Sequence, residues 1–195
     1  MIVRVSMALN GRYQLTLVSM QIDAVLIEHG LVYLILEILE TKRSLSDGDS
    51  SLIRREAAWI CSNIAASSAS HIEVLFTDND VYSKIIEGIY EGDLKLRKEC
   101  LWTVANLLSG ADLMHLRFMV GAGVFTLFPF LLKAPDIRLV ERSLSSLRIL
   151  LRAFPEHIGL VRSESMLAAL NLSVNQEDNN LLVCLNCLLV LLVPI

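Results

Sequence analysis

Two tryptophans and two asparagines are the residues of this chain whose types and spacing best suit recognition chemistry. Trp59 is followed four residues later by Asn63, and Trp102 is followed four residues later by Asn106; the chain has only these two tryptophans. Residues four apart on a helix share a face, so each pair sets an indole beside an amide. A pair of indoles forms walls for the aliphatic stem of a lysine or arginine, and the amides can bond the backbone of an extended peptide.

A glutamate stands three residues before each tryptophan, on about the same helical face. These residues, Glu56 and Glu99, are suited to pair with lysine or arginine side chains of a ligand. The combined chemistry is recognition of a short, extended, basic peptide, with no covalent step. The alternative interpretation is that the tryptophans pack between helices and the asparagines cap or bridge helices.

The elements that must position these residues are helices. Apolar residues recur at helical spacing in four short stretches, each followed by a polar turn and then a longer apolar segment. We see no alternating strand pattern, so the predicted fold is all-α. The four short stretches are 31–40, 83–92, 125–133 and 166–174.

The helices recur with a regular period. Trp59 and Trp102 are 43 residues apart, and three histidines that mark the same place in successive units, His71, His115 and His157, are 44 and 42 apart. A period of this length with three helices per unit is typical of armadillo or HEAT repeats, which stack into a right-handed superhelical solenoid. Helix starts in separate repeats explain the histidines better than a metal site does.

About four repeats are predicted, with a remnant of a preceding repeat at the N-terminus. The boundaries are 1–20 for the remnant and 21–68, 69–112, 113–156 and 157–195 for the repeats. One repeat later the positions of the tryptophan and the asparagine are occupied by Ser145 and Ile149, and one further repeat later by Cys187 and Leu191. The recognition pattern therefore stops after two repeats, and we call each Trp and Asn pair a rung. The last helix, 181–193, is apolar nearly all round; we expect a longer array or a partner that covers the ends.

Composition excludes several function classes. Hydrophobic residues make up 54% of the 195 residues and the net charge is −4, which argues against nucleic acid as a partner and favours a basic partner. The apolar segment 181–195 is too short for a membrane span and is interrupted by Asn186, so no membrane is expected. No secretory signal is convincing.

The cysteines and the remaining polar residues suggest no enzyme and no cofactor. The four cysteines are expected to be reduced core residues of an intracellular protein. Cys184 and Cys187 form a C-x-x-C pair without two further ligands nearby, so no metal is expected. We find no Ser/His/Asp arrangement, no phosphate-binding loop and no paired-carboxylate site.

With these two W-x-x-x-N motifs the chain resembles the importin-α family, whose armadillo repeats carry W-x-x-x-N on the third helix. "RREAAWICSNIAA" and "RKECLWTVANLLSG" are similar to its seventh and eighth repeats, and "DIRLVERSLSSLRILL" to its ninth, which also lacks the tryptophan. The resemblance covers roughly residues 20–192 and is specific within 51–152. It implies an armadillo fold and an adaptor that binds nuclear localisation signals in nuclear protein import.

The resemblance also implies roles for particular residues in the family's minor signal-binding groove. The tryptophans would sandwich lysine stems and the asparagines would hold the peptide backbone. Glu56, Glu99 and Ser62 match positions that contact the basic side chains, and Gly110 matches a turn glycine. Partners implied are basic signal peptides of cargo proteins, importin-β and the export receptor of importin-α, with localisation in cytoplasm and nucleus.

The chain departs from the family pattern in several places. Asn10 is the candidate for the asparagine of the preceding repeat, but the "GRYQLT" that follows it lacks an acidic residue in register, which weakens the pocket for the key lysine. The major groove and the basic segment that recruits importin-β are absent, so we expect a fragment or a divergent short form.

Two other readings stay open. The first is an armadillo scaffold resembling catenin-type proteins, which bind acidic extended segments through grooves lined by lysine and arginine. The rungs here are tryptophan, asparagine and glutamate, which favours basic ligands instead. The second is a degenerate copy that binds nothing strongly.

Overall fold

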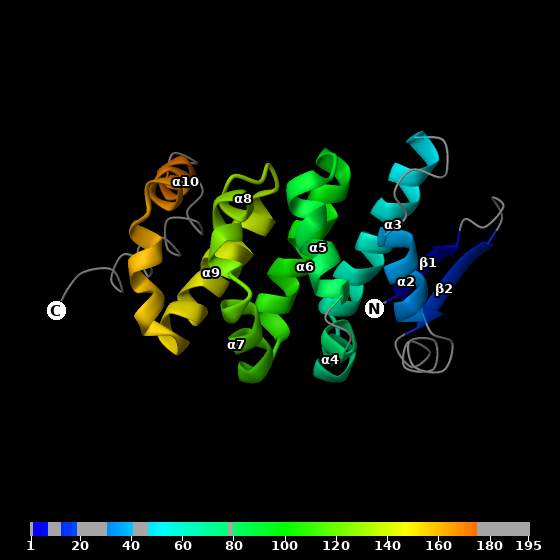
Figure 1. Cartoon of the computed structure of the whole chain (residues 1–195), viewed down its shortest axis with the longest axis horizontal. Coiled ribbons are helices and arrows are strands. Elements are labelled where there is room, and N and C mark those ends of the chain that lie inside the picture. Colours follow the sequence, from blue (N-terminus) through cyan, green and yellow to red (C-terminus); the bar gives the residue numbers. More distant parts are fainter. Residues whose placement is uncertain (1, 8–12, 19–30, 41–46, 78–79, 175–195) are drawn as a thin grey trace. The chain divides into compact units, whose positions relative to one another are not determined.

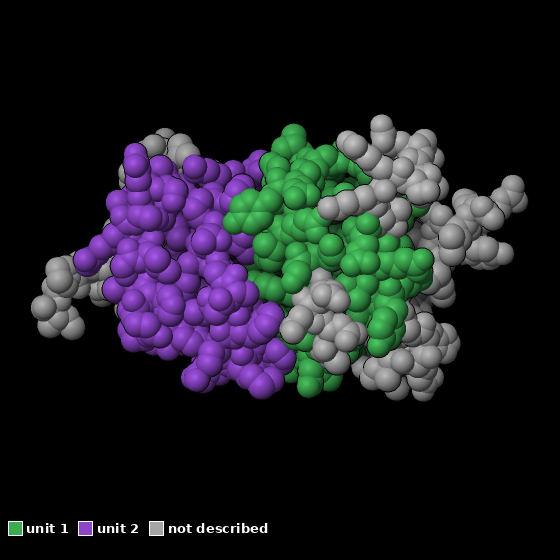
Figure 2. All heavy atoms as spheres, in the orientation of Figure 1, with its two compact units in different colours: residues 1–110 green, residues 111–195 purple. Residues whose placement is uncertain are grey.

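The computed structural model describes residues 2–7, 13–18, 31–40, 47–77 and 80–174. The chain divides into two compact units, residues 1–110 and 111–195, shown in green and purple in Figure 2.

Unit 1 contains five helices among its described residues, and their lengths follow the predicted order of short and long segments (Figure 1). Helices α4, α5 and α6 make one complete unit of a short, a medium and a long helix, and α3 is the long helix that precedes them. The bounds are Leu31–Glu40 for α2, Asp47–Ala65 for α3, Ala69–Thr77 for α4, Asp80–Glu91 for α5 and Leu94–Gly110 for α6.

The junction between α5 and α6 is closed by polar side chains. Asp93 Oδ1 accepts hydrogen bonds from the backbone N–H groups of Lys95 and Leu96, at 2.9 and 2.8 Å, which caps the start of α6. The Arg97 guanidinium donates to the carbonyls of Ile89 and Gly92, at 2.7 and 3.1 Å, which satisfies the end of α5. The position of α6 is therefore fixed by its own first turn.

Apolar side chains of all five helices fill the core of unit 1. The two cysteines of this unit, Cys61 and Cys100, are free and buried within it. Burial raises the pKa of the Cys61 thiol, and raises the pKa of the Cys100 thiol to about 12, so both are protonated at neutral pH. The expectation of reduced core cysteines is confirmed for these two; Cys184 and Cys187 lie outside the described residues. Large side chains with almost no exposure include Ile35, Ile64, Ile72, Leu75, Ile85, Ile89, Leu107 and Leu108.

Unit 2 repeats the pattern of short helices followed by a long one. Asp112 and Asp136 cap α7 and α9, accepting from the backbone N–H groups of His115 and Arg138. Gly123 has φ +81°, a left-handed conformation that favours glycine, and it ends the turn after α7. The bounds are Leu113–Gly121 for α7, Val124–Leu127 for the 3-10 helix η2, Phe128–Leu132 for α8, Ile137–Ala153 for α9, Pro155–Arg162 for the 3-10 helix η3 and Glu164–Val174 for α10.

The N-terminal stretch differs from the expected helical remnant of a preceding repeat. Strands β1, Ile2–Met7, and β2, Tyr13–Val18, pair antiparallel, with Val3 opposite Leu17 and Val5 opposite Leu15. Within each strand apolar and polar residues alternate, which is the period of a strand rather than a helix. Asn-Gly at positions 10 and 11, between the two runs, is a typical hairpin signal in the sequence.

The four short helices and the long helices that follow the first three of them are confirmed, and the repeat boundaries stay predictions. The predicted last helix, 181–193, lies outside the described residues. Among the residues that the structure describes, no single helix is long and apolar enough to cross a membrane. The bent pair Leu113–Gly121 and Val124–Leu132 is long and apolar enough when its two parts are taken together, by length and composition alone.

Candidate functional site

Helices α3 and α6 lie side by side and present the predicted site residues (Figure 1). Two side chains of α6 reach backbone carbonyls of α3. Thr103 Oγ1 donates to the carbonyl of Ala58 at 3.3 Å, and Asn106 Nδ2 donates to the carbonyl of Ser62 at 2.9 Å. The bonded residues are 45 and 44 apart in sequence, close to the repeat period, so the two long helices pack in the register of the repeat.

Because of this register, the two tryptophans occupy equivalent positions on neighbouring helices. Trp59 and Trp102 are both half-buried, unlike the fully buried residues around them, Ala58 and Leu101 among them. Each indole therefore combines contact with the protein and contact with solvent. This is the exposure that a wall for a ligand side chain requires.

The two asparagines are not equivalent. Asn63 is half-buried, and its Nδ2 donates to the carbonyl of Trp59 in its own helix, at 3.0 Å. Asn106 is only 7% exposed, and its Nδ2 donates to the carbonyl of Ser62 on the neighbouring helix. The interpretation of an asparagine that bridges helices therefore holds for Asn106. Asn63 is the more accessible of the two amides.

Ser62 and Gly110 also have structural roles in unit 1. Ser62 is 7% exposed and its Oγ donates to the carbonyl of Trp59 at 2.8 Å. Gly110 is the last residue of α6, and a Cβ there would come within 2.8 Å of Ile72 Cδ1, so the glycine lets α4 approach closely. Both residues stay predictions as peptide contacts.

The two glutamates lie in a cluster with basic residues of the same helices. Arg55 Nη2 donates to Glu56 Oε1 at 3.0 Å, with 29% and 32% of the two side chains exposed. Burial raises the pKa of Glu99; the charges of Lys98 and Arg55 lower it, and the charge of Glu56 raises it. The two carboxylates are thus close enough to repel each other, with the guanidinium of Arg55 near both.

Arg55 and Thr103 are the residues of this site that sequence reasoning missed. The basic residue before each glutamate was visible in "REAAW" and "KECLW", but the sequence could not show that it pairs with the neighbouring carboxylate. The bond from Thr103 to the neighbouring helix had no sequence signal of its own. The arrangement offers partly exposed indoles, two carboxylates and an amide, groups that can contact a cationic chain.

One repeat after Trp102 and Asn106, where the two-rung pattern is predicted to stop, the corresponding positions belong to unit 2. On α9, Ser145 is half-buried and Ile149 is 43% exposed. The corresponding positions one further repeat on, Cys187 and Leu191, and the upstream candidate Asn10 lie outside the described residues.

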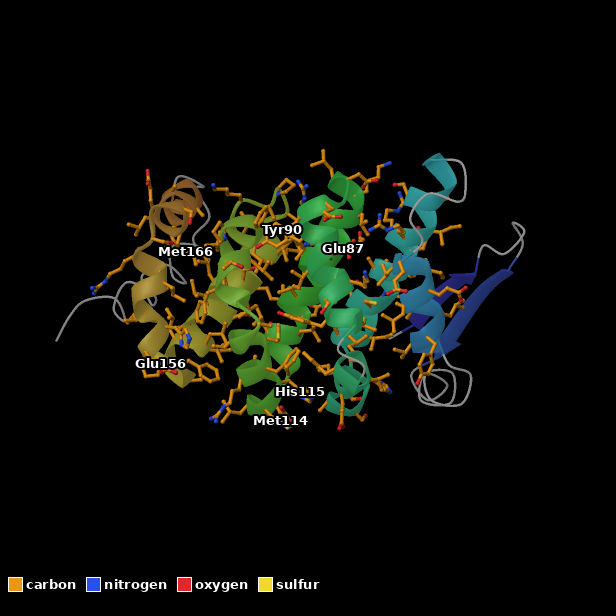
Figure 3. The ribbon with its side chains drawn as sticks, in the orientation of Figure 1. Glu87, Tyr90, Met114, His115, Glu156 and Met166 are labelled. Atoms are coloured by element: carbon orange, nitrogen blue, oxygen red, sulfur yellow. The ribbon has the colours of Figure 1, made fainter. Side chains whose placement is uncertain are left out.

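Two of the three histidines of the repeats bond to residues near their own helix starts, and the third stacks on an aromatic ring. His71 Nδ1 lies 2.9 Å from Ser67 Oγ, and His115 Nδ1 lies 2.9 Å from Asp112 Oδ1. His157 stacks on the ring of Phe125, with ring centroids 5.2 Å apart. Figure 3 shows His115 on α7 beside Met114. Within the described part of the chain, no group of three or more His, Cys, Asp or Glu residues is placed to hold a metal ion.

Comparison with known proteins gives a distant relationship in sequence. No family model matches the chain. The chain is 26% identical over 133 residues to importin subunit alpha-2 of Oryza sativa subsp. japonica, a match that covers 63% of this chain and 25% of that protein. It is 27% identical over 101 residues to importin subunit alpha-5 of Arabidopsis thaliana, covering 52% and 19%. The chain thus spans a quarter or less of the length of these relatives, and the homology to importin subunit alpha is weak.

Solved structures establish the fold. A computationally designed armadillo repeat protein for modular peptide recognition matches with a TM-score of 0.65 at 14% identity, covering 86% of this chain and 66% of that one. A designed armadillo repeat protein in complex with the peptide (KR)4 matches with a TM-score of 0.56 at 16% identity, covering 89% and 86%. The prediction of a helical armadillo-repeat fold is confirmed, with strands β1 and β2 as the local departure from an all-α chain.

Proposed function

We propose that this armadillo-repeat chain, a distant relative of importin subunit alpha, binds short basic peptides of the nuclear localisation signal type on the α3 and α6 surface. The fold and the distant homology support a protein-binding repeat scaffold. The observation that carries the finer proposal is the register of α3 and α6. In this register Trp59 and Trp102 occupy equivalent, partly exposed positions on neighbouring helices, with Glu56 and Glu99 one turn earlier.

The chemistry of the site favours an extended cationic chain. The aliphatic stem of a lysine or arginine would pack on the indoles, and its cationic head would meet the carboxylates. Glu99 is half-buried, and burial raises its pKa because the carboxylate loses contact with water. A ligand cation would supply a favourable interaction in place of that water. Asn63, the more exposed amide, would bond the peptide backbone, while Asn106 holds the two helices in register.

A basic ligand also agrees with what is known of one similar fold. The designed armadillo protein that matches this chain was solved with the peptide (KR)4. Its low identity to this chain limits the comparison to the fold, so the ligand preference here depends on the residues named above. By relationship to importin subunit alpha, we further propose a non-catalytic adaptor role in nuclear import, shuttling between cytoplasm and nucleus, with importin-β and the export receptor as partners.

The test is a titration of a fluorescein-labelled lysine- and arginine-rich peptide, followed by anisotropy. Wild-type chain should bind saturably, and binding should weaken as salt rises because ion pairs contribute. The double variant Trp59→Ala/Trp102→Ala should lose at least about tenfold in affinity, the scale of losing an aromatic anchor.

The matched control removes an exposed aromatic residue elsewhere in unit 1. Tyr33 on α2 is 69% exposed and lies outside the α3 and α6 surface. Tyr33→Ala should bind the peptide within about twofold of wild type. An unchanged affinity in the double tryptophan variant, with its helix content intact by circular dichroism, would overturn the proposed site.

A further inference from the structure

Helix α9 of unit 2 carries a row of arginines on the side opposite to its core face. Arg138, Arg142 and Arg152 are exposed, and Ile149 between them is 43% exposed. Their spacing of four, seven and three residues places them along one stripe of the helix. We call these four residues the arginine row. The opposite face is buried, with Leu139, Val140, Leu144, Leu147 and Leu150 fully inaccessible.

The charge of this helix is unusual for a chain that is acidic as a whole. α9 contains four arginines, with half-exposed Arg148 as the fourth, and Glu141 is its only acidic residue. Arg138 pairs with Asp136, the N-cap residue, at 3.4 Å, and 78% of its side chain remains exposed. Like charges four residues apart on a helix repel each other, and Arg138 and Arg142 are such a pair.

The slot pattern sharpens the contrast with the proposed peptide site. The position that carries Glu56 on α3 and Glu99 on α6 carries Arg142 on α9, one repeat later. The tryptophan and asparagine positions carry Ser145 and Ile149. The same slot therefore changes the sign of its charge, and a basic peptide would be repelled from α9.

We propose that the arginine row binds an extended acidic peptide segment, with its carboxylates on the arginines and an apolar side chain on Ile149. The planar guanidinium of arginine can form two parallel hydrogen bonds with one carboxylate, so each arginine of the row is suited to bind an acidic side chain. Arg138 and Arg142 lie about 6 Å apart along the helix axis. Every second residue of an extended chain is separated by about 6.6 Å. Alternate acidic residues of one segment can therefore meet successive arginines.

The test uses a fluorescein-labelled peptide of alternating glutamate and serine with one central leucine. The wild-type chain should bind it saturably at low salt, and the Arg142→Glu variant should bind it at least about tenfold more weakly. The matched control is Arg117→Glu on α7, an exposed arginine of the same unit outside the row, which changes the net charge equally. It should bind within about twofold of wild type.

Each other outcome contradicts the proposal. No saturable binding by the wild-type chain would show that the row is not a site for such a peptide. An equal loss in both charge-reversal variants would show that only the net charge acts. If an RNA oligonucleotide of equal charge displaces the peptide at lower concentrations than unlabelled peptide does, the row is a nucleic-acid surface instead. Should Arg142→Glu lose helix content by circular dichroism, the neutral variant Arg138→Gln/Arg152→Gln takes its place, with the same expected loss.

Discussion

Asn106 donates a hydrogen bond from its Nδ2 to the main-chain carbonyl of Ser62, 44 residues earlier and one repeat away, at 2.9 Å. Asn63, at the same slot one repeat before, donates only to the carbonyl of Trp59 in its own helix. The two asparagines of the repeated motif therefore differ in what they hold together. The side chain of Asn106 joins α6 to α3, whereas the side chain of Asn63 bonds only within α3.

This difference predicts different effects on stability. Asn106→Ala removes a buried bond between helices and should lower the free energy of unfolding by about 1–2 kcal/mol. Asn63→Ala removes a half-exposed bond within one helix and gains helix propensity, so the change should stay within about 0.5 kcal/mol. Urea unfolding followed by circular dichroism measures both, and equal destabilisation would contradict the assignment.

The ion pair between Arg55 and Glu56 predicts that removing Arg55 increases the affinity for a basic peptide. Its guanidinium bonds Glu56 at 3.0 Å, so a ligand cation must compete with a cation of the chain itself. Arg55→Gln should bind the basic peptide about threefold more tightly, the scale of one partly exposed ion pair. The measurement is the same anisotropy titration at constant ionic strength.

Lys98 provides the control for this prediction, because it stands in the same slot of the next repeat and its charge also acts on Glu99. Lys98→Gln changes the net charge equally but leaves the bond between Arg55 and Glu56 in place. It should tighten binding less than Arg55→Gln does. If the two variants tighten binding equally, general electrostatics explain the effect and Arg55 is no competitor.

The raised pKa of Glu99 predicts that basic-peptide affinity depends on pH. Burial favours the neutral acid, and only the carboxylate attracts a cation, so affinity should rise as pH rises through the raised pKa. The window begins at the ordinary glutamate value of about 4.3 and extends upward from it. A peptide of lysine, arginine and glycine has no group that titrates there, so its affinity reports the protein.

Glu99→Gln tests which carboxylate is responsible. The variant has no titrating group at this position, so its affinity should be lower at neutral pH and change less with pH than that of wild type. Glu56→Gln should keep a pH dependence, because Glu99 still titrates, but move it to lower pH, because the charge of Glu56 no longer raises the pKa of Glu99. A pH profile that is identical in Glu99→Gln and wild type would contradict the prediction.

Much of this architecture could be predicted because it repeats. The spacing of Trp59 and Trp102 alone gave the period, and with helical apolar patterns it gave the order of short and long helices. The pairing of β1 and β2 could not be predicted from the repeat, because its helical period does not extend to the two short alternating runs. The bridge from Asn106, the pairing of Arg55 and the burial of Glu99 depend on side-chain rotamers and on helix-to-helix packing, which spacing does not encode.

The packing of α5 against α6 supplies a last prediction, at Gly88. A Cβ at this position would lie 2.6 Å from the Sγ of Cys100, which is fully buried. In an exposed helix, replacing glycine by alanine would stabilise by about 1 kcal/mol. Here overpacking opposes that gain and costs about 1–3 kcal/mol, so Gly88→Ala should be neutral to destabilising.

A double-mutant cycle separates the two contributions. Removing the sulfur should relieve the overlap, so Gly88→Ala should be less destabilising in a Cys100→Ala background than in wild type, with a coupling of about 1 kcal/mol or more. Urea unfolding of the four proteins gives the coupling directly. Additive effects would mean that Gly88 is not needed for the close approach of α5 and α6. They would also mean that the position of Trp102 on α6 does not depend on this contact.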